Sequence, residues 1–140
     1  MSISSIIGRH TTAYGPVRAS VVSALKAAGL KVGGTAGYPR VEVHSVIETQ
    51  RLDKAGSVRR LSVTVESISD GSLPESAEMN ETAMAALTAD DALTPGAGWR
   101  VMEVLPDQLQ ELTETSDSAK ILYRTIQSYD ILVERQTTNS

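Results

Sequence analysis

The sequence predicts an α+β domain, a four-stranded antiparallel sheet with two main helices packed on it in the order α-β-β-α-β-β. Two stretches place apolar residues every three to four positions, which is typical of a helix that buries one side. Four other stretches alternate apolar and polar residues, as strands with one buried side do. Glycine- and proline-rich turns separate these stretches. The 140 residues are predicted to form a single domain, residues 1–140.

Residues 1–14 are interpreted as an N-terminal arm, and the first helix is predicted to open at Gly15 and Pro16. Gly29 is suited to end this helix. Its predicted apolar face consists of Val17, Val21, Leu25 and Ala28. Residues 30–39 contain three glycines and a proline and are predicted to be a loop. The loop lacks the Gly-Lys-Ser/Thr ending of a phosphate-binding loop, which disfavours that function.

Two alternating runs then predict a β-hairpin with its turn at residues 51–56. One face of the first run, residues 40–49, carries Val41, Val43, Ser45 and Ile47, and the other carries Glu42, His44, Val46 and Glu48. In the second run, residues 57–69, the predicted inner face carries Leu61, Val63 and Val65, and the outer face carries Arg60, Ser62, Thr64 and Glu66.

The second helix is predicted to start at Ser72, which has capping-box spacing to Glu75. Pro74 is favourable in the first turn. The predicted apolar stripe of this helix is Met79, Ala83, Ala86 and Leu87. A third strand follows over residues 99–106, and Pro106 is expected to end it. Residues 107–119 are acidic and polar and are predicted to form an exposed loop.

The last strand is predicted over residues 121–136 and is followed by a short polar tail, residues 137–140. One face carries Ile121, Tyr123, Thr125, Tyr129, Ile131 and Val133. The other face is only half polar, because Leu122, Ile126 and Leu132 interrupt its hydrophilic residues. Since a face open to water should be mostly polar, we expect this second face to be partly covered.

Composition excludes several functional classes. The net charge of −4 and a pI near 5.1 disfavour a dedicated nucleic-acid binder, which normally carries a basic surface. The absence of cysteine excludes disulfides, thiol nucleophiles and thiolate metal sites and fits a reducing compartment such as the cytosol. No apolar run is long enough for a membrane span, so no membrane association is expected.

Candidate catalytic and metal sites are weak. Glu42, His44 and Glu48 share one predicted strand face, but alternate residues of a strand lie roughly 6–7 Å apart. A surface charge cluster is therefore favoured over a metal site. The paired carboxylates Asp90 with Asp91 and Asp107 with Glu111 are interpreted as solvated charges. Trp99 and Tyr38 are interpreted as core residues at strand starts. We expect no catalytic residues, no metal and no cofactor.

The succession of elements resembles the tail-terminator and tail-completion proteins of tailed bacteriophages over residues 15–136. The segments that carry this resemblance are VVSALKAAG, YPRVEV, SAEMNETAMAAL, GWRVMEV and above all the closing LYRTIQSYDILVER. The resemblance implies a non-enzymatic virion protein, made in the host cytoplasm, that forms a ring, commonly a hexamer. Its implied partners are further copies of itself, the tail tube protein and the head-tail connector, or neck, protein. Genomic DNA would pass through the lumen without sequence-specific binding.

Interface residues are predicted from expected exposure, since the resemblance has no site motif. The predicted set comprises the hairpin tip, the basic residues beside it, the acidic loop and the half-apolar strand face: Arg51, Leu52, Asp53, Lys54, Arg59, Arg60, Glu111, Glu114, Asp117, Leu122, Ile126 and Leu132. We expect the basic residues near the hairpin to pair with the acidic loop of a neighbouring copy. The alternatives are a head-side neck or stopper protein, a small adaptor or chaperone that binds partners by strand addition, and an enzyme.

Overall fold

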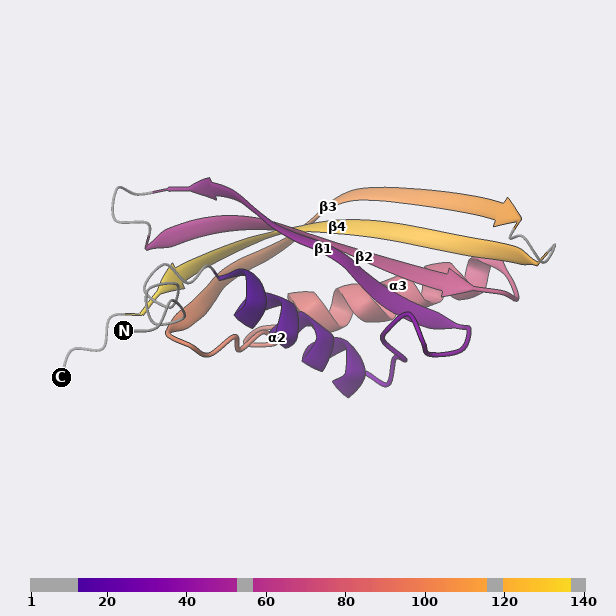
Figure 1. Ribbon diagram of the computed structural model, residues 1–140, viewed down its shortest axis with the longest axis horizontal. Coiled ribbons are helices and arrows are strands. Elements are labelled where there is room, and N and C mark those ends of the chain that lie inside the picture. Colours follow the sequence, from indigo (N-terminus) through magenta and orange to yellow (C-terminus); the bar gives the residue numbers. More distant parts are fainter. Residues whose placement is uncertain (1–12, 53–56, 116–119, 137–140) are drawn as a thin grey trace, which may run out of the picture.

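The computed structural model describes residues 13–52, 57–115 and 120–136. It contains two helices and four strands in the predicted order (Figure 1). Their bounds are α2 Tyr14–Ala27, β1 Arg40–Arg51, β2 Val58–Ser69, α3 Leu73–Thr88, β3 Trp99–Thr115 and β4 Ile121–Arg135. All neighbouring strands are antiparallel, in the order β1-β2-β4-β3. The predicted α+β class and element order are confirmed.

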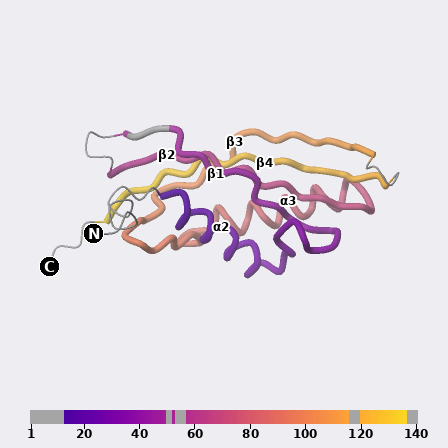
Figure 2. Tube along the Cα trace, viewed as in Figure 1, coloured from indigo at the N-terminus to yellow at the C-terminus, as the bar shows by residue number. Residues whose placement is uncertain are grey.

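Both helices lie on the same side of the sheet, where α2 packs on β1 and α3 packs on β2 and β4 (Figure 2). The core forms between this side of the sheet and the helices. In its centre, Leu61 of β2 pairs with Ile131 of β4, and Val63 pairs with Tyr129; all four are fully buried. Neither helix, within the described residues, is long and apolar enough to cross a membrane.

Helix α2 begins at Tyr14, one residue before the predicted start, and Gly29 follows its end as predicted, but Ala28 of the predicted apolar face is exposed. Its buried residues Val17, Val21 and Leu25 are spaced at helical intervals and face the core. At the C-terminus, the Gly29 amide donates to the Lys26 carbonyl (3.0 Å) and the Leu30 amide donates to the Leu25 carbonyl (3.2 Å). This is a Schellman motif, and it requires the positive φ of 88° that glycine adopts without strain.

Helix α3 begins at the predicted N-cap. The Ser72 hydroxyl accepts a hydrogen bond from the Glu75 amide at 3.2 Å. The buried face is more polar than predicted, because Ser76, Asn80, Ala83 and Leu87 are buried whereas Met79 and Ala86 are only half-buried. Ser76 faces Thr125 of β4 with their hydroxyl oxygens 2.8 Å apart. Helix α3 therefore packs on β4 partly through a satisfied polar contact.

Strand β1 departs from the predicted alternation after Val43. The register with β2 shifts between Val43 and Ser45, so His44 is an extra residue in the strand. From Ser45 to Glu48 each side chain therefore lies on the face opposite to the predicted one, until a second register shift between Glu48 and Gln50. Val46, predicted to face outward, is buried (4% exposed), and Ile47, predicted to face inward, is 57% exposed. The predicted faces are therefore wrong for the second half of the strand.

Strand β3 does not stop at Pro106. It continues to Thr115, so residues 107–115, predicted to be a loop, form an edge strand paired with β4. The register shifts between Pro106 and Leu109. Proline is compatible with this position because an edge strand has one side without ladder hydrogen bonds. Every residue from Leu105 to Thr115 is exposed.

Some predicted features lie outside the described residues. These are most of the N-terminal arm, the tail at 137–140, Asp53 and Lys54 of the hairpin turn, and Asp117. Trp99, interpreted as a core residue, is buried with 3% of its surface exposed. Tyr38 is also interpreted as a core residue, but it is only half-buried. The guanidinium carbon of Arg40 lies 4.3 Å from the centre of the Tyr38 ring.

Candidate assembly surfaces

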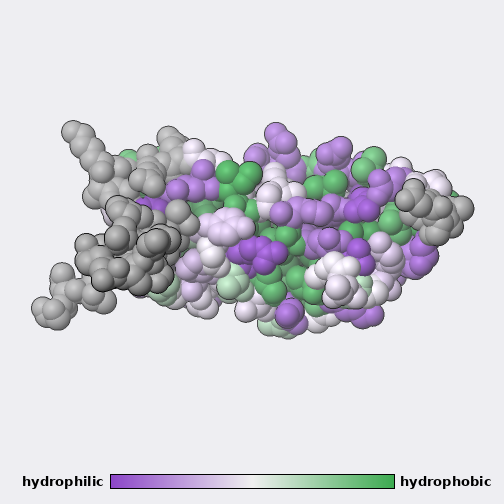
Figure 3. Space-filling model, viewed as in Figure 1, coloured by the Kyte–Doolittle hydropathy of each residue, from purple (hydrophilic) through white to green (hydrophobic). Residues whose placement is uncertain are grey.

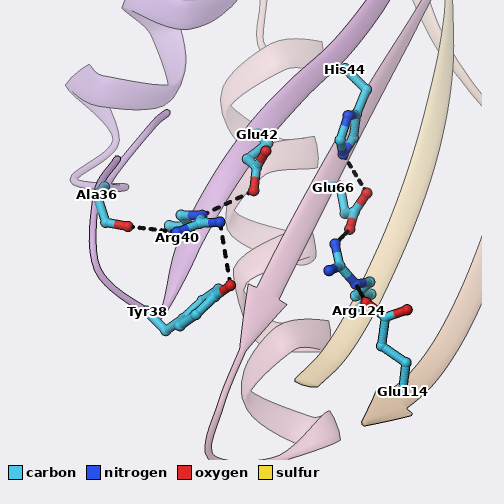
Figure 4. A network of polar contacts seen from close by, with 8 residues as sticks. All are labelled: Ala36, Tyr38, Arg40, Glu42, His44, Glu66, Glu114 and Arg124. Carbon is cyan, nitrogen blue, oxygen red and sulfur yellow. Dashed lines mark hydrogen bonds and ion pairs between the residues drawn. The ribbon is translucent and has the colours of Figure 1, made fainter. Parts of the chain in front are cut away.

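A chain of charged residues crosses all four strands on the side of the sheet opposite the helices (Figure 4). The His44 imidazole lies 2.5 Å from the Glu66 carboxylate. Glu66, only 5% exposed, also pairs with Arg124, which in turn reaches Glu114 at 2.5 Å. These four residues come from β1, β2, β4 and β3 respectively. These ion pairs therefore connect both edge strands, β1 and β3, to the two central strands.

The electrostatics of Arg124 show how these ion pairs compensate for removing its charge from water. Removal from water acts to lower the pKa of the guanidinium, but the hydrogen bond and attraction from Glu66, followed by those from Glu114, outweigh it and raise the pKa. The arginine is therefore held in its charged form between two carboxylates. Glu114, predicted to contact a partner, is already bound within its own chain.

The three residues considered for a metal site point to different partners. Glu42 pairs with Arg40 at 2.9 Å, His44 pairs with Glu66, and Glu48 lies 3.1 Å from Arg59 (Figure 4 shows the first two pairs). The bulge at His44 puts Glu48 on the opposite face from Glu42, which separates them. Across the described ranges, no group of three His, Asp or Glu side chains lies close enough to hold a metal ion.

The two basic residues beside the predicted hairpin tip, Arg59 and Arg60, contact residues of their own chain. Arg59 is buried (6% exposed), with its guanidinium carbon 5.0 Å from the centre of the Trp99 ring. Arg60 pairs with Asp130 of β4 at 2.6 Å. The expectation that Arg59 is exposed is therefore wrong, because the strand places it on the helix side of the sheet beside Val133.

The half-apolar face of β4 is partly closed by the chain itself. Leu122 is buried with 4% exposed, which corrects the expectation that it needs external cover. Ile126 and Leu132 are half-buried and remain accessible in part. Leu52, at the start of the hairpin turn, is 40% exposed.

Three exposed leucines lie close together in sequence on the outer part of β3, residues 105–115, which we call the β3 arm. Leu105 is 48%, Leu109 57% and Leu112 40% exposed. The register places Leu105 and Leu112 on the face opposite the helices and Leu109 on the helix side. Both faces of the arm are therefore open to water. Figure 3 shows no single large apolar patch in this view, since hydrophobic and hydrophilic side chains alternate.

The arm is held to β4 by polar contacts. The Gln108 amide donates to the Ser128 hydroxyl at 2.9 Å, and the Gln127 side-chain amide donates to the Gln108 carbonyl at 3.0 Å. Sequence reasoning missed Leu105, Leu109 and Leu112 because the surrounding residues are acidic and polar. The length of β4 was the available indication, since its 15 residues need a partner longer than the predicted eight-residue strand 99–106.

Comparisons with known proteins show the fold. No protein-family model matches the sequence, and no curated protein matches it. Among solved structures, a chain of a structure described as the virion of a native gene transfer agent (GTA) particle superposes with a TM-score of 0.66. The match covers 84% of this chain and 94% of that chain, with 19% sequence identity. At this identity the likeness establishes that the two chains share a fold.

Proposed function

We propose that this chain is a structural virion protein of a tailed, phage-like particle that forms a ring, commonly of six copies, at the end of the tail tube and joins it to the head connector. The protein has no enzymatic role in this proposal. It is made in the host cytoplasm, ends in the virion, and contacts the tail tube protein and the neck protein. Genomic DNA passes through the ring without sequence-specific binding.

The observation that carries the proposal is the β3 arm, an edge strand whose every residue from Leu105 to Thr115 is exposed. An isolated protein gains no folding free energy from apolar side chains that stay in water. Burial of Leu105, Leu109 and Leu112 against another molecule would give these exposed side chains a role. The shared fold with a chain of a gene transfer agent virion supports a partner within such a particle.

A ring follows from the asymmetry of the subunit. A copy that carries two different contact surfaces associates head to tail, and such contacts close into a ring when the rotation between copies divides a full turn. A head-side neck or stopper protein would have the same requirement. Binding to isolated tail tubes separates these two roles, because only the terminator is expected to cap a tube in the absence of heads.

An adaptor or chaperone that adds a partner strand to its sheet is the second candidate. The described part of β3 has β4 as its only strand neighbour, so its outer edge is open to such addition. Pro106, two register shifts and four acidic residues on β3 disfavour it, because each is a feature that discourages further strand pairing.

The test is the mass and shape of the purified protein as a function of concentration. Sedimentation velocity and negative-stain electron microscopy are expected to show a closed ring, either alone or on tubes assembled from the tail-tube protein of the same genome. Leu109→Asp is expected to prevent ring formation, whereas Ala85→Asp, an exposed change on α3, is expected to leave it intact. A protein that stays monomeric with and without tubes overturns the proposal.

A further inference from the structure

Two opposite edges of the molecule carry exposed charges of opposite sign. From Tyr14 to Tyr38 the chain carries Arg18, Lys26 and Lys31 and no acidic residue. From Val101 to Thr115 it carries only acidic charges, on Glu103, Asp107, Glu111 and Glu114. We call Arg18, Lys26 and Lys31 the basic edge, and Glu103, Asp107 and Glu111 the acidic edge.

The topology places these two sets far apart. The basic edge lies on α2 and the loop after it, which flank β1, and the acidic edge lies on β3. Strands β1 and β3 are the opposite edges of the sheet, with β2 and β4 between them (Figure 1). A single copy therefore cannot bring the two sets together, whereas two copies placed side by side can.

Neither set is neutralised within the chain. The six side chains of the two edges belong to exposed residues, and none of them makes an ion pair among the described residues. Arg18 donates a hydrogen bond to the Val43 carbonyl at 3.4 Å, which leaves its charge without an opposite charge. Other surface charges do pair across strands, as Arg60 does with Asp130 and Arg100 with Glu134. Each edge therefore carries charges of one sign that no described residue neutralises.

The edges also indicate the type of contact. Beside Val41, the edge of β1 is already occupied, because the Val41 amide donates to the Lys31 carbonyl (2.7 Å) and the Gly33 amide donates to the Val41 carbonyl (3.0 Å). On β3, Pro106 lacks an amide hydrogen and the register shifts interrupt the ladder. A continuous sheet between copies is disfavoured at these positions, which leaves side-chain contacts.

From this arrangement we infer that the acidic edge of one copy docks on the basic edge of the next. The inference rests on the proposed self-assembly and names its two surfaces. Leu105, Leu109 and Leu112 lose contact with water in this contact, while the opposite charges select the orientation and exclude contacts between like edges. Because the two surfaces differ, every contact points in the same direction around the assembly.

The test uses two charge-reversed proteins and a mixing experiment. Asp107→Lys with Glu111→Lys makes both edges basic, and Lys26→Glu with Lys31→Glu makes both edges acidic. Each variant alone is expected to self-associate at least about tenfold more weakly than the original chain, because like charges then face each other. An equimolar mixture of the two is expected to assemble, since each contact then joins opposite charges.

The control is Glu78→Lys with Glu81→Lys, which produces the same change in net charge as the β3 variant on the exposed side of α3. It is expected to assemble as the original chain does. Circular dichroism establishes that each variant is folded. Assembly of the original chain is also expected to weaken between about 0.05 M and 0.5 M salt, because salt screens exposed charges.

The outcomes separate the inference from the proposed function. If the original chain forms rings but either reversed variant assembles equally well, or the mixture fails to assemble, the docking of these two edges is overturned and the ring stands. If reversal of the acidic edge alone has an effect, the arm contacts some other surface and the inference is again overturned. If the original chain never self-associates, both the docking of the two edges and the proposed ring are overturned.

Discussion

The centre of the sheet and the β3 arm are both built from paired antiparallel strands, yet they are stabilised differently. In the centre, β4 places Tyr129, Ile131 and Val133 against the helices, and each is fully buried. In the arm, no residue from Leu105 to Thr115 is buried. Cross-strand hydrogen bonds and the ion pair from Arg124 to Glu114 hold the arm in place of a core.

Strand pairing and core formation are therefore separable in this protein. The centre contributes most of the folding free energy, because apolar burial contributes roughly 25 cal/mol per Å². The arm contributes little to folding and keeps its leucines available for association. Four substitutions, in decreasing order of their predicted influence on stability, test this division.

Leu61→Ala is expected to have the largest effect. Leu61 is fully buried opposite Ile131, so truncation leaves a cavity and is expected to lower the free energy of unfolding by about 3 kcal/mol. Urea denaturation followed by circular dichroism measures it. The matched change in the arm, Leu109→Ala, is expected to alter stability by less than about 0.5 kcal/mol. Equal losses at the two positions would contradict the division.

Arg124→Leu is expected to destabilise the fold by about 2 kcal/mol, because it leaves the buried Glu66 carboxylate with only His44 as an ionic partner. The matched control is Arg100→Leu, which removes a cross-strand ion pair to Glu134, between β3 and β4, at an exposed position. That change is expected to cost no more than about 0.5 kcal/mol. Thermal and urea unfolding of both variants would reveal whether burial sets the difference.

Ser72→Ala tests helix α3, which packs on the centre of the sheet. The Ser72 hydroxyl caps α3, so its loss is expected to lower the free energy of unfolding by about 1 kcal/mol. Thr82→Ala, which removes a hydroxyl from the exposed interior of the same helix, is expected to have almost no effect or to stabilise slightly. A similar loss for both would mean that the cap has no special importance. Assembly should be unchanged in each variant.

Tyr129→Phe is expected to have the smallest effect at neutral pH. The buried Tyr129 hydroxyl has no hydrogen-bond partner within the described residues, so its removal is expected to stabilise by less than about 1 kcal/mol. Burial raises the pKa of this phenol above its ordinary value. The unfolded chain therefore loses the proton first, and stability is expected to fall as the pH rises above about 10.

The matching measurement is urea unfolding at a series of alkaline pH values. Tyr129→Phe is expected to show a smaller loss of stability above about pH 10 than the original chain. Tyr123→Phe, a half-buried position on the same strand, serves as the control and should follow the original chain. An identical alkaline loss in all three proteins would show that the Tyr129 phenol is not responsible.

Local sequence patterns were sufficient for the helices and for the centre of the sheet. The 3.6-residue spacing of Val17, Val21 and Leu25 and the alternation of Leu61, Val63 and Val65 each have one structural solution, and both were predicted correctly. The capping role of Ser72 was also predicted, because a capping box needs only residues three apart in sequence.

The candidate surface was predicted only in part. Exposure of Glu111 and of the surrounding segment was predicted, but its strand structure was not, because an exposed edge strand needs no apolar alternation. The bulge at His44 escaped prediction because the register with β2, rather than any residue type, creates it. Burial of Arg59 depends on Glu48 and Trp99, which are distant in sequence.

The α+β class, the order of the elements and the separation of basic residues before β1 from acidic residues on β3 all follow from the order of residues along the chain. These properties depend on composition and on periodicity between near neighbours. Which side chains are available to a partner follows only from the folded arrangement, because exposure depends on how far β4 carries β3 beyond the helices and on which charges meet opposite charges across the sheet. Long-range strand pairing sets both, and no local pattern encodes it.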